Sequence, residues 1–305
     1  MLLPPYLKKG NTIAITCPAG YLEKSKIEHA VQTFMSWGMK VIVGKTIGSD
    51  STNYFSGTDE ERWKELQCYL DDDSIHAIIM GRGGYGMSRI IDRLNFRKFK
   101  KHPKWICGFS DITLLHNHLQ SRLKIASIHG PMCAAYIPKD GYDPGRIADA
   151  VRKMLTGKKN NLYPIPLHPA NRAGKAEGIL VGGNLAMVTH GIGSPSEVQT
   201  MGNILFLEDI GEHLYKIDRM LLQLKRAGLL DHLAGVILGQ FSDSEDTARP
   251  FGSDLETILS EHFADYDYPV CMGFPTGHDN ENFPLKFGSM HRLVITKKNI
   301  SLKEV

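Results

Sequence analysis

The sequence predicts an α/β fold in two domains, the first built on a parallel sheet. In the first half of the chain, short apolar segments alternate with amphipathic segments of helical length, which indicates right-handed βαβ units. Near the middle, this alternation is interrupted by Pro164, Pro166 and Pro169, a pattern typical of a linker. The 305 residues are 42% hydrophobic and 23% charged, as in a globular protein with a substantial core, and this length favours two domains.

The elements of the first half follow from apolar runs and helical periodicity. We expect strands at residues 12–16, 40–43, 75–80 and 105–109, and helices at residues 26–37, 58–70 and 110–123. The first helix has apolar side chains on one face from Ile27 to Phe34 and ends at Gly38. Thr58 and Glu61 have the spacing of a capping box, which opens the second helix.

The second half is more mixed. We expect strands at residues 204–208, 235–240, 270–274 and 292–296, a helix at residues 214–227, and a glycine-punctuated segment at residues 178–184. The helix has one apolar face and ends at Gly228. We therefore place the N-terminal domain at residues 1–157, the linker at residues 158–175 and the C-terminal domain at residues 176–305.

Charge and composition exclude several classes of function. The net charge of +3 arises from well-mixed signs, so we expect no nucleic-acid partner. No apolar run approaches the roughly 20 residues of a membrane span, and the first twenty residues lack a signal-peptide pattern. We therefore expect a cytoplasmic protein that does not bind membranes. The five scattered cysteines indicate reduced thiols. His116 and His118 point to different sides of their helix, so we expect no metal site there.

The segment around Ser110 has the pattern of a catalytic nucleophile. A strand runs into Gly108-Phe109-Ser110 and then directly into a helix, which is the context of a nucleophile elbow. The helix N-terminus favours a developing oxyanion. The second glycine of the usual elbow pattern is replaced by Ile112. The alternative is that Ser110 only caps its helix.

A glycine-rich loop follows the neighbouring predicted strand. Residues 81–86 contain four glycines and should lie at the same sheet edge as Ser110. Backbone N–H groups in such a loop approach a ligand closely, either as a phosphate cradle or as half of an oxyanion hole. The Gly-Lys-Ser/Thr ending of a phosphate loop is missing. An ordinary tight turn remains the alternative.

Two further residues complete a candidate catalytic set. Glu208 ends an apolar strand, and His278 lies in a loop just beyond another. Each alone is typical of a solvated acid or a surface histidine. Together with Ser110 they stand at three strand ends, in the order serine, acid, histidine that serine hydrolases also use. A single site explains all three positions better than three unrelated surface features.

The chain resembles the LD-carboxypeptidases, a group of serine peptidases that also includes the microcin C immunity hydrolases. The matching motifs are collinear and span nearly the whole chain. They are Gly81-Arg82-Gly83-Gly84-Tyr85-Gly86, Gly108-Phe109-Ser110-Asp111, His129-Gly130-Pro131, Gly182-Gly183-Asn184-Leu185, Phe206-Leu207-Glu208-Asp209 and Gly273-Phe274-Pro275-Thr276-Gly277-His278.

The resemblance implies a metal-independent serine carboxypeptidase without a cofactor. Ser110 would be the nucleophile, His278 the general base and Glu208 its partner, with the backbone N–H groups of Asp111 and Gly84 as oxyanion donors. The implied fold is a flavodoxin-like domain followed by a swivelling β/α domain, with the site at their junction, usually in a homodimer. The implied reaction is hydrolysis of the L,D-peptide bond to a C-terminal D-amino acid in a small murein peptide.

Two other functions stay open at this point. Within the same family, the substrate could be an aminoacyl-nucleotide or another amide conjugate. From a different class, a two-domain ligand-binding protein would share the alternating first half but would not need Ser110, Glu208 and His278. Arg82 is a candidate for binding a terminal carboxylate, or else an exposed structural arginine. His129 either lines the site or is a packed structural histidine.

Overall fold

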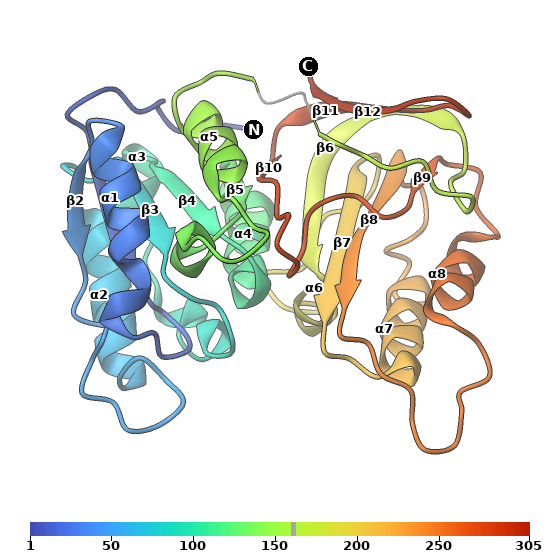
Figure 1. Ribbon diagram of the computed structural model, residues 1–305, viewed down its shortest axis with the longest axis horizontal. Helices are drawn as coiled ribbons and strands as arrows, with labels where there is room; N and C mark the ends of the chain where they lie inside the picture. Colours follow the sequence, from blue (N-terminus) through green and yellow to red (C-terminus); the bar gives the residue numbers. More distant parts are fainter. Residues whose placement is uncertain (160–162) are drawn as a thin grey trace.

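The computed structural model describes residues 1–159 and 163–305, and Figure 1 shows two α/β halves side by side. Each half is built on a six-stranded sheet, and most neighbouring strands in both sheets are parallel. The predicted fold class is therefore confirmed. Residues 160–162 of the predicted linker lie outside the described residues. No helix in the described ranges is both long enough and apolar enough to cross a membrane.

The first sheet has the strand order β10-β5-β4-β3-β1-β2. Its parallel strands are β1 (Thr12–Thr16), β2 (Lys40–Val43), β3 (Ala77–Met80), β4 (Trp105–Gly108) and β5 (Ser127–His129). All are buried except β2, which is an edge strand with exposed side chains. The carboxyl ends of β3 and β4 therefore lie next to each other, as the sequence predicts for the glycine-rich loop and Ser110.

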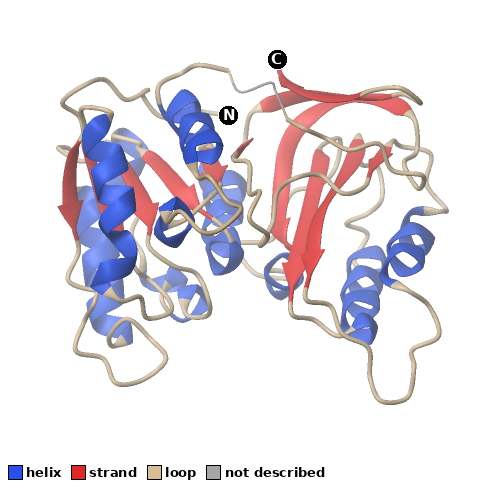
Figure 2. Cartoon of the chain, viewed as in Figure 1, coloured by secondary structure: helices blue, strands red, loops and turns tan. Residues whose placement is uncertain are grey.

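Helices cover both faces of this sheet (Figure 2). They are α1 (Glu28–Ser36), α2 (Asp59–Asp71), α3 (Arg97–Lys101), α4 (Thr113–His118) and α5 (Gly145–Leu155). Because successive strand residues point to opposite faces, Ile13 and Ile79 pack with α1 and α5, whereas Ala14 and Ile78 pack with α2 and α4. The first half is thus a three-layer structure.

The second sheet has the order β12-β11-β6-β7-β8-β9. Its strands are β6 (Gly174–Asn184), β7 (Ile204–Ile210), β8 (Gly235–Ser242), β9 (Val270–Cys271), β11 (Met290–Ile295) and β12 (Ile300–Glu304). One face packs against α6 (Leu185–His190), α7 (Leu214–Arg226) and α8 (Leu255–Phe263). On the other face, β11 and β12 curve over Phe206 and its neighbours (Figure 1).

A short strand late in the chain connects the two halves. β10 (Leu285–Phe287) pairs antiparallel with β5 of the first sheet, with Leu285 opposite His129. Its apolar side chains also pack into the core around Phe206 in the second half. Lys286, which is 1% exposed, forms an ion pair with Glu304 of β12 at 2.7 Å. The chain therefore returns to the first sheet after it has built most of the second.

Most predicted elements have the expected type and place. The strands at residues 12–16 and 40–43 are confirmed at both ends. The predicted helix at residues 110–123 is wrong as a continuous α-helix. A 3-10 turn (Ser110–Ile112) opens it, and a π turn (Leu119–Leu123) closes it. The strand predicted at residues 270–274 is shorter, because only Val270–Cys271 pairs with β8.

The two halves also dock through the end of β6. The backbone N–H of Asn184 donates to Thr113 Oγ1 at 3.0 Å, across the junction. Gly183 lies so close to Thr113 that a Cβ at residue 183 would be 2.5 Å from the Thr113 side chain. A glycine is required there by contact as well as by its φ of +131°. This contact places the end of β6 against the helix that follows Ser110.

Gly183→Ala is expected to push the halves apart and to lower both activity and stability. The new methyl group collides with Thr113, so the free energy of unfolding should fall by roughly 1–3 kcal/mol, in the range of overpacking substitutions. Gly252→Ala is the matched control, because Gly252 also has a positive φ (+101°) but has nothing within 4 Å of the added Cβ. Urea unfolding and turnover of both variants test this. Equal effects of the two substitutions would attribute the loss to backbone strain alone.

Candidate active site

Ser110 lies in a strained turn directly after β4. Its φ is +63°, a backbone conformation that non-glycine residues rarely adopt and that is concentrated at functional sites. Phe109 before it is extended, and a 3-10 turn begins at Ser110. The Ser110 hydroxyl makes no hydrogen bond within the described residues, so it does not act as a helix cap. The backbone therefore has the form expected of a nucleophile elbow.

The glycine-rich loop packs against this turn. A Cβ added to Gly83 would lie 3.0 Å from Ser110 Cβ and 3.3 Å from the backbone nitrogen of Asp111. Gly84 beside it has a φ of +90°. The N–H groups of Gly84 and Asp111 donate no hydrogen bond to any described residue, so both are free to bind an anionic oxygen. The loop and the elbow are therefore parts of one site.

Glu208 and His278 form a hydrogen-bonded pair on the other half. His278 Nδ1 lies 2.7 Å from Glu208 Oε2, with Glu208 fully buried at the end of β7 and the His278 side chain 13% exposed. Burial opposes the protonation of His278, but the hydrogen bond and negative charge of Glu208, aided by Asp209 and Asp279, outweigh it and raise the pKa. His278 thus keeps its Nε2 for another partner.

Phe109 connects the two groups of residues. Its ring lies 4.7 Å from the His278 ring, centroid to centroid, and it directly precedes Ser110. Ser110 and His278 do not hydrogen-bond in this structure. Such catalytic contacts are often long without substrate and tighten in the complex. The structure thus brings the serine and the acid–base pair to one junction, from opposite halves of the molecule.

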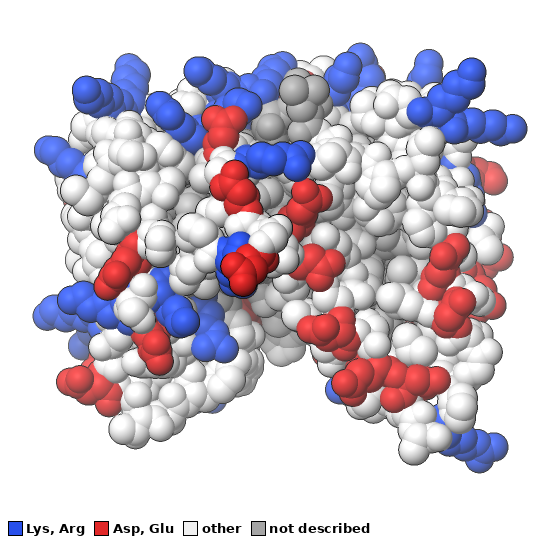
Figure 3. Space-filling model, viewed as in Figure 1, with Lys and Arg blue, Asp and Glu red and all other residues white. Residues whose placement is uncertain are grey.

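A cavity opens at this junction. It has a volume of about 420 Å³ and is lined by both Phe109 and His278, and such a volume is within the usual range of small-molecule sites, roughly 300–1,000 Å³. Figure 3 shows the molecule hollowed between the halves, at the edge toward which β7 and β8 point in Figure 1. Lys and Arg side chains gather along the opposite edge in this view, near the chain termini. The cavity is large enough for a peptide substrate.

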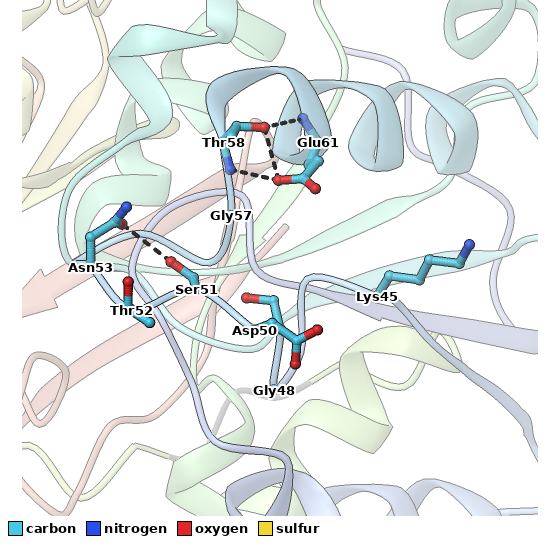
Figure 4. Close-up of a pocket in the computed structure, with 10 residues that line it drawn as sticks. Lys45, Gly48, Asp50, Ser51, Thr52, Asn53, Gly57, Thr58 and Glu61 are labelled. Carbon is cyan, nitrogen blue, oxygen red and sulfur yellow. Dashed lines mark hydrogen bonds between the residues drawn. The ribbon is translucent and has the colours of Figure 1, made fainter.

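A larger hollow lies elsewhere, between β2 and α2. It measures about 590 Å³ and is lined by loop residues between Lys45 and Glu61. Figure 4 shows that its polar groups bond one another, with Ser51 bonded to Asn53 and Thr58 to Glu61. It contains none of the residues predicted to be functional. The smaller cavity beside His278 is therefore the better candidate.

The carboxylate of Asp111 has a role that the sequence did not indicate. The sequence points only to its backbone N–H, but its fully buried Oδ2 accepts from the N–H of Met87 at 2.8 Å. It thereby fixes the far end of the glycine-rich loop to the residue after Ser110. Burial raises the pKa of Asp111 to about 6, although the Met87 N–H and the nearby Arg62 charge oppose this. No sequence pattern distinguishes this acid from a solvated one.

Asp111→Asn is expected to stabilise the protein above pH 6. The folded pKa of about 6 is above the ordinary value of 3.8, so the stability of the wild type falls as pH rises between them. The amide keeps an acceptor for Met87 but cannot ionise. The variant should gain on the order of 1–3 kcal/mol at pH 7 and nothing at pH 3.5. Urea unfolding across this pH range tests it, and a gain that does not depend on pH would contradict it.

Two buried histidines near the elbow are structural. His116 Nε2 lies 2.8 Å from the carbonyl of Gly108, and its Nδ1 lies 2.8 Å from Ser127 Oγ. Burial lowers the pKa of His116 to about 4, so the neutral ring donates to Gly108 and accepts from Ser127. His129 is also fully buried, and its ring packs against Phe109. The packed alternative for His129 is therefore correct.

Asp209 is a second buried acid that the sequence did not single out. Its carboxylate accepts from Asn184 Nδ2 at 2.8 Å and from the N–H of Ala186 at 2.9 Å. Burial and the neighbouring Glu208 raise its pKa to about 6. These bonds join the end of β7 to the end of β6, which itself docks on Thr113. Asp209 therefore connects the strand that carries Glu208 to the helix that follows Ser110.

Comparison with known proteins gives a consistent result. Residues 13–130 match the LD-carboxypeptidase N-terminal domain, and residues 177–293 match the LD-carboxypeptidase C-terminal domain. A probable murein peptide carboxypeptidase of Bacillus subtilis is 34% identical over 94% of this chain and 89% of its own length. The microcin C7 self-immunity protein of Escherichia coli is 27% identical over 99% of this chain and 96% of its own.

A solved structure shows the same architecture over nearly the whole chain. The muramoyltetrapeptide carboxypeptidase from Oxalobacter formigenes superposes with a TM-score of 0.84 at 30% identity, covering 96% of this chain and 98% of that one. The microcin C7 self-immunity protein in complex with glutamyl sulfamoyl guanosine superposes with a TM-score of 0.87 at 22% identity. The second likeness concerns the fold alone.

Proposed function

The chain belongs to the LD-carboxypeptidase family and is a serine-type carboxypeptidase, and we propose that Ser110, His278 and Glu208 carry out its reaction. The proposed substrate is a murein tetrapeptide, from which the enzyme removes the C-terminal D-amino acid. The observation that supports this best is the Glu208–His278 pair, which lies at the same junction as Ser110, a half-buried serine in a strained turn. Relatives named as murein carboxypeptidases support this substrate.

The acid–base chemistry follows from the hydrogen bond between Glu208 and His278. A serine hydroxyl is a weak nucleophile near neutral pH, so a base must take its proton as attack begins. Glu208 accepts from His278 Nδ1–H, which leaves the lone pair of Nε2 to accept the Ser110 proton. The same carboxylate stabilises the imidazolium that forms.

The free N–H groups beside Ser110 suit the charge that develops on the substrate. As Ser110 Oγ bonds to the carbonyl carbon, the carbonyl oxygen becomes an oxyanion, which we assign to the N–H groups of Asp111 and Gly84. One such donor typically lowers the activation barrier by about 3 kcal/mol. His278 then gives its proton to the leaving nitrogen as the C–N bond breaks. Water, deprotonated by His278, then bonds to the acyl carbon, and His278 returns the proton to Ser110 Oγ as the ester bond breaks.

Amide hydrolysis of an aminoacyl-nucleotide is the second candidate, favoured by the likeness to the microcin C7 self-immunity protein over nearly the full chain. The third interpretation, a ligand-binding protein without catalysis, is wrong because the chain belongs to a family of peptidases.

Purified protein without added metal should release D-alanine from murein tetrapeptide, detected by mass spectrometry. A tetrapeptide ending in L-alanine is the control. Hydrolysis of an aminoacyl-nucleotide conjugate alone would support the second candidate instead.

Three further proposals concern organisation. We propose that the protein is cytoplasmic and forms a homodimer. We also propose that it needs no metal or cofactor and binds neither nucleic acid nor membranes. We also keep the domain ranges 1–157 and 176–305, joined by residues 158–175. The separate sheets support this division, although β10 within the second range pairs with the first sheet. Sedimentation equilibrium tests the dimer.

A further inference from the structure

Three unpaired cations line the cavity beside His278. Lys26, Arg82 and Lys139 come from three separate segments of the first half and meet at this cavity. None of them forms an ion pair within the described part of the chain. By contrast, Arg62 and Arg89 in the same half are both paired with Asp59. Unpaired cations gathered in one cavity favour an anionic ligand.

Arg82 is the most constrained of the three. Its Nη1 donates to the carbonyl of Tyr21 at 2.7 Å, which restricts the guanidinium and leaves its other N–H groups available. Arg82 also directly precedes Gly83, which packs against Ser110. A group bound by this guanidinium therefore lies in the same cavity as His278. The planar fork of arginine suits a carboxylate, which accepts two parallel hydrogen bonds.

The same cavity is also lined by hydrogen-bond acceptors, Asp279 and Asn282. Asp279 follows His278 and is held by Ser242 Oγ at 2.6 Å. Asn282 is only 3% exposed, and its Oδ1 has no hydrogen-bond partner among the described residues. A buried acceptor without a partner destabilises a protein unless a ligand or water satisfies it. The lining of the cavity thus combines cationic donors with acceptors, together with apolar side chains such as Leu22 and Met132.

We propose that Arg82, Lys26 and Lys139 form a subsite that binds a carboxylate of the substrate and thereby selects acidic peptides. The inference rests on the proposed peptidase function and adds the residues that read the substrate. The carboxylate has two sources in a murein tetrapeptide. One is the terminal carboxylate of the departing D-alanine. The other is the side-chain carboxylate of a diaminopimelate at the third position.

The test compares matched substrates on matched variants. The variants are Lys26→Met with Lys139→Met, which removes two lysines that make no ion pair, and Arg82→Gln, which keeps a donor for Tyr21. Lys98→Met, on α3 and away from the cavity, is the control. The substrates are the tetrapeptide acid and its C-terminal amide, each with diaminopimelate or lysine at the third position.

The wild type and Lys98→Met should prefer the substrate with the recognised carboxylate over the matched substrate that lacks it. We expect a preference of roughly tenfold to hundredfold in kcat/KM, chiefly through KM. Both cavity variants should lose that preference, whereas Lys98→Met should turn over both the better and the poorer substrate as the wild type does. Loss of the acid-over-amide preference assigns the terminal carboxylate, and loss of the diaminopimelate-over-lysine preference assigns the side chain. Variants that retain both preferences would overturn the subsite.

Failure of the peptidase function is recognised separately, because the wild type would then release no D-alanine from any peptide. Calorimetric titration of the acid and amide peptides into the same proteins decides the subsite in that case. The wild type should bind the carboxylate-bearing peptide more tightly, and the cavity variants should not. Equal affinity of the wild type for all four peptides would refute the subsite.

Discussion

Ser110→Ala is expected to abolish turnover, with a loss of roughly 10⁴-fold to 10⁶-fold in kcat, as when a nucleophile is removed from a serine hydrolase. The hydroxyl makes no hydrogen bond within the described residues, so its removal should leave the fold intact. Release of D-alanine from murein tetrapeptide measures the loss, and circular dichroism verifies the fold. Product formed at the wild-type rate would exclude Ser110 as nucleophile.

Ser110→Gly separates the chemical role of this residue from its backbone strain. Both variants lack the hydroxyl, but only glycine adopts the φ of +63° without steric cost. The free energy of unfolding should therefore be about 1 kcal/mol higher for the glycine variant than for the alanine variant. Both variants should be inactive. Equal urea midpoints for the two variants would mean that the turn is not strained.

Glu208→Gln should be the second most damaging change, with a loss of roughly 10³-fold to 10⁴-fold in kcat/KM. The amide occupies the same buried space, but it cannot stabilise an imidazolium, and it allows the wrong tautomer of His278. Glu212→Gln is the matched control, since Glu212 lies on the same segment and pairs with the exposed Lys216 instead. A variant with full activity would remove Glu208 from the mechanism.

The pH profile of Glu208→Gln adds an independent measurement. His278 must be neutral to act as a base, so activity falls as pH drops below its pKa. Glu208 raises that pKa, whereas burial lowers it. Once the carboxylate is replaced, burial dominates and the acid limb of kcat/KM should move to lower pH, despite the smaller plateau. An acid limb that stays in place would show that another group titrates there.

The helices and strands were predictable where a local sequence pattern indicates them. The strands at residues 12–16 and 40–43 are apolar runs bounded by turns, and Thr58 with Glu61 forms the expected capping box. The strand β10 was not predictable, because three residues show no periodicity and their partner, β5, lies more than 150 positions earlier. The helix α5, in contrast, has an apolar face from Ile147 to Met154 that the local sequence does show.

The residues of the site also fall into those that local sequence predicts and those that it does not. Ser110 and His278 follow strands, and Glu208 lies near the end of one, so local sequence was enough to nominate them. The carboxylate of Asp111 and the ring of His116 act through backbone groups that only the tertiary structure brings near. The need for glycine at Gly183 likewise arises from Thr113, which belongs to the other half. Sequence patterns thus nominated the proposed reacting groups but not the groups that hold them.

The late strand β10 has a consequence for folding. It follows the His278 loop by only a few residues and pairs with β5, so the loop is connected to the sheet that carries Ser110. Contacts between such distant segments are slow to form, because a long loop must close first. During refolding, helical signal should therefore recover before catalytic competence. We expect the enzyme to become active only when β10, late in the chain, has paired with β5 of the first sheet.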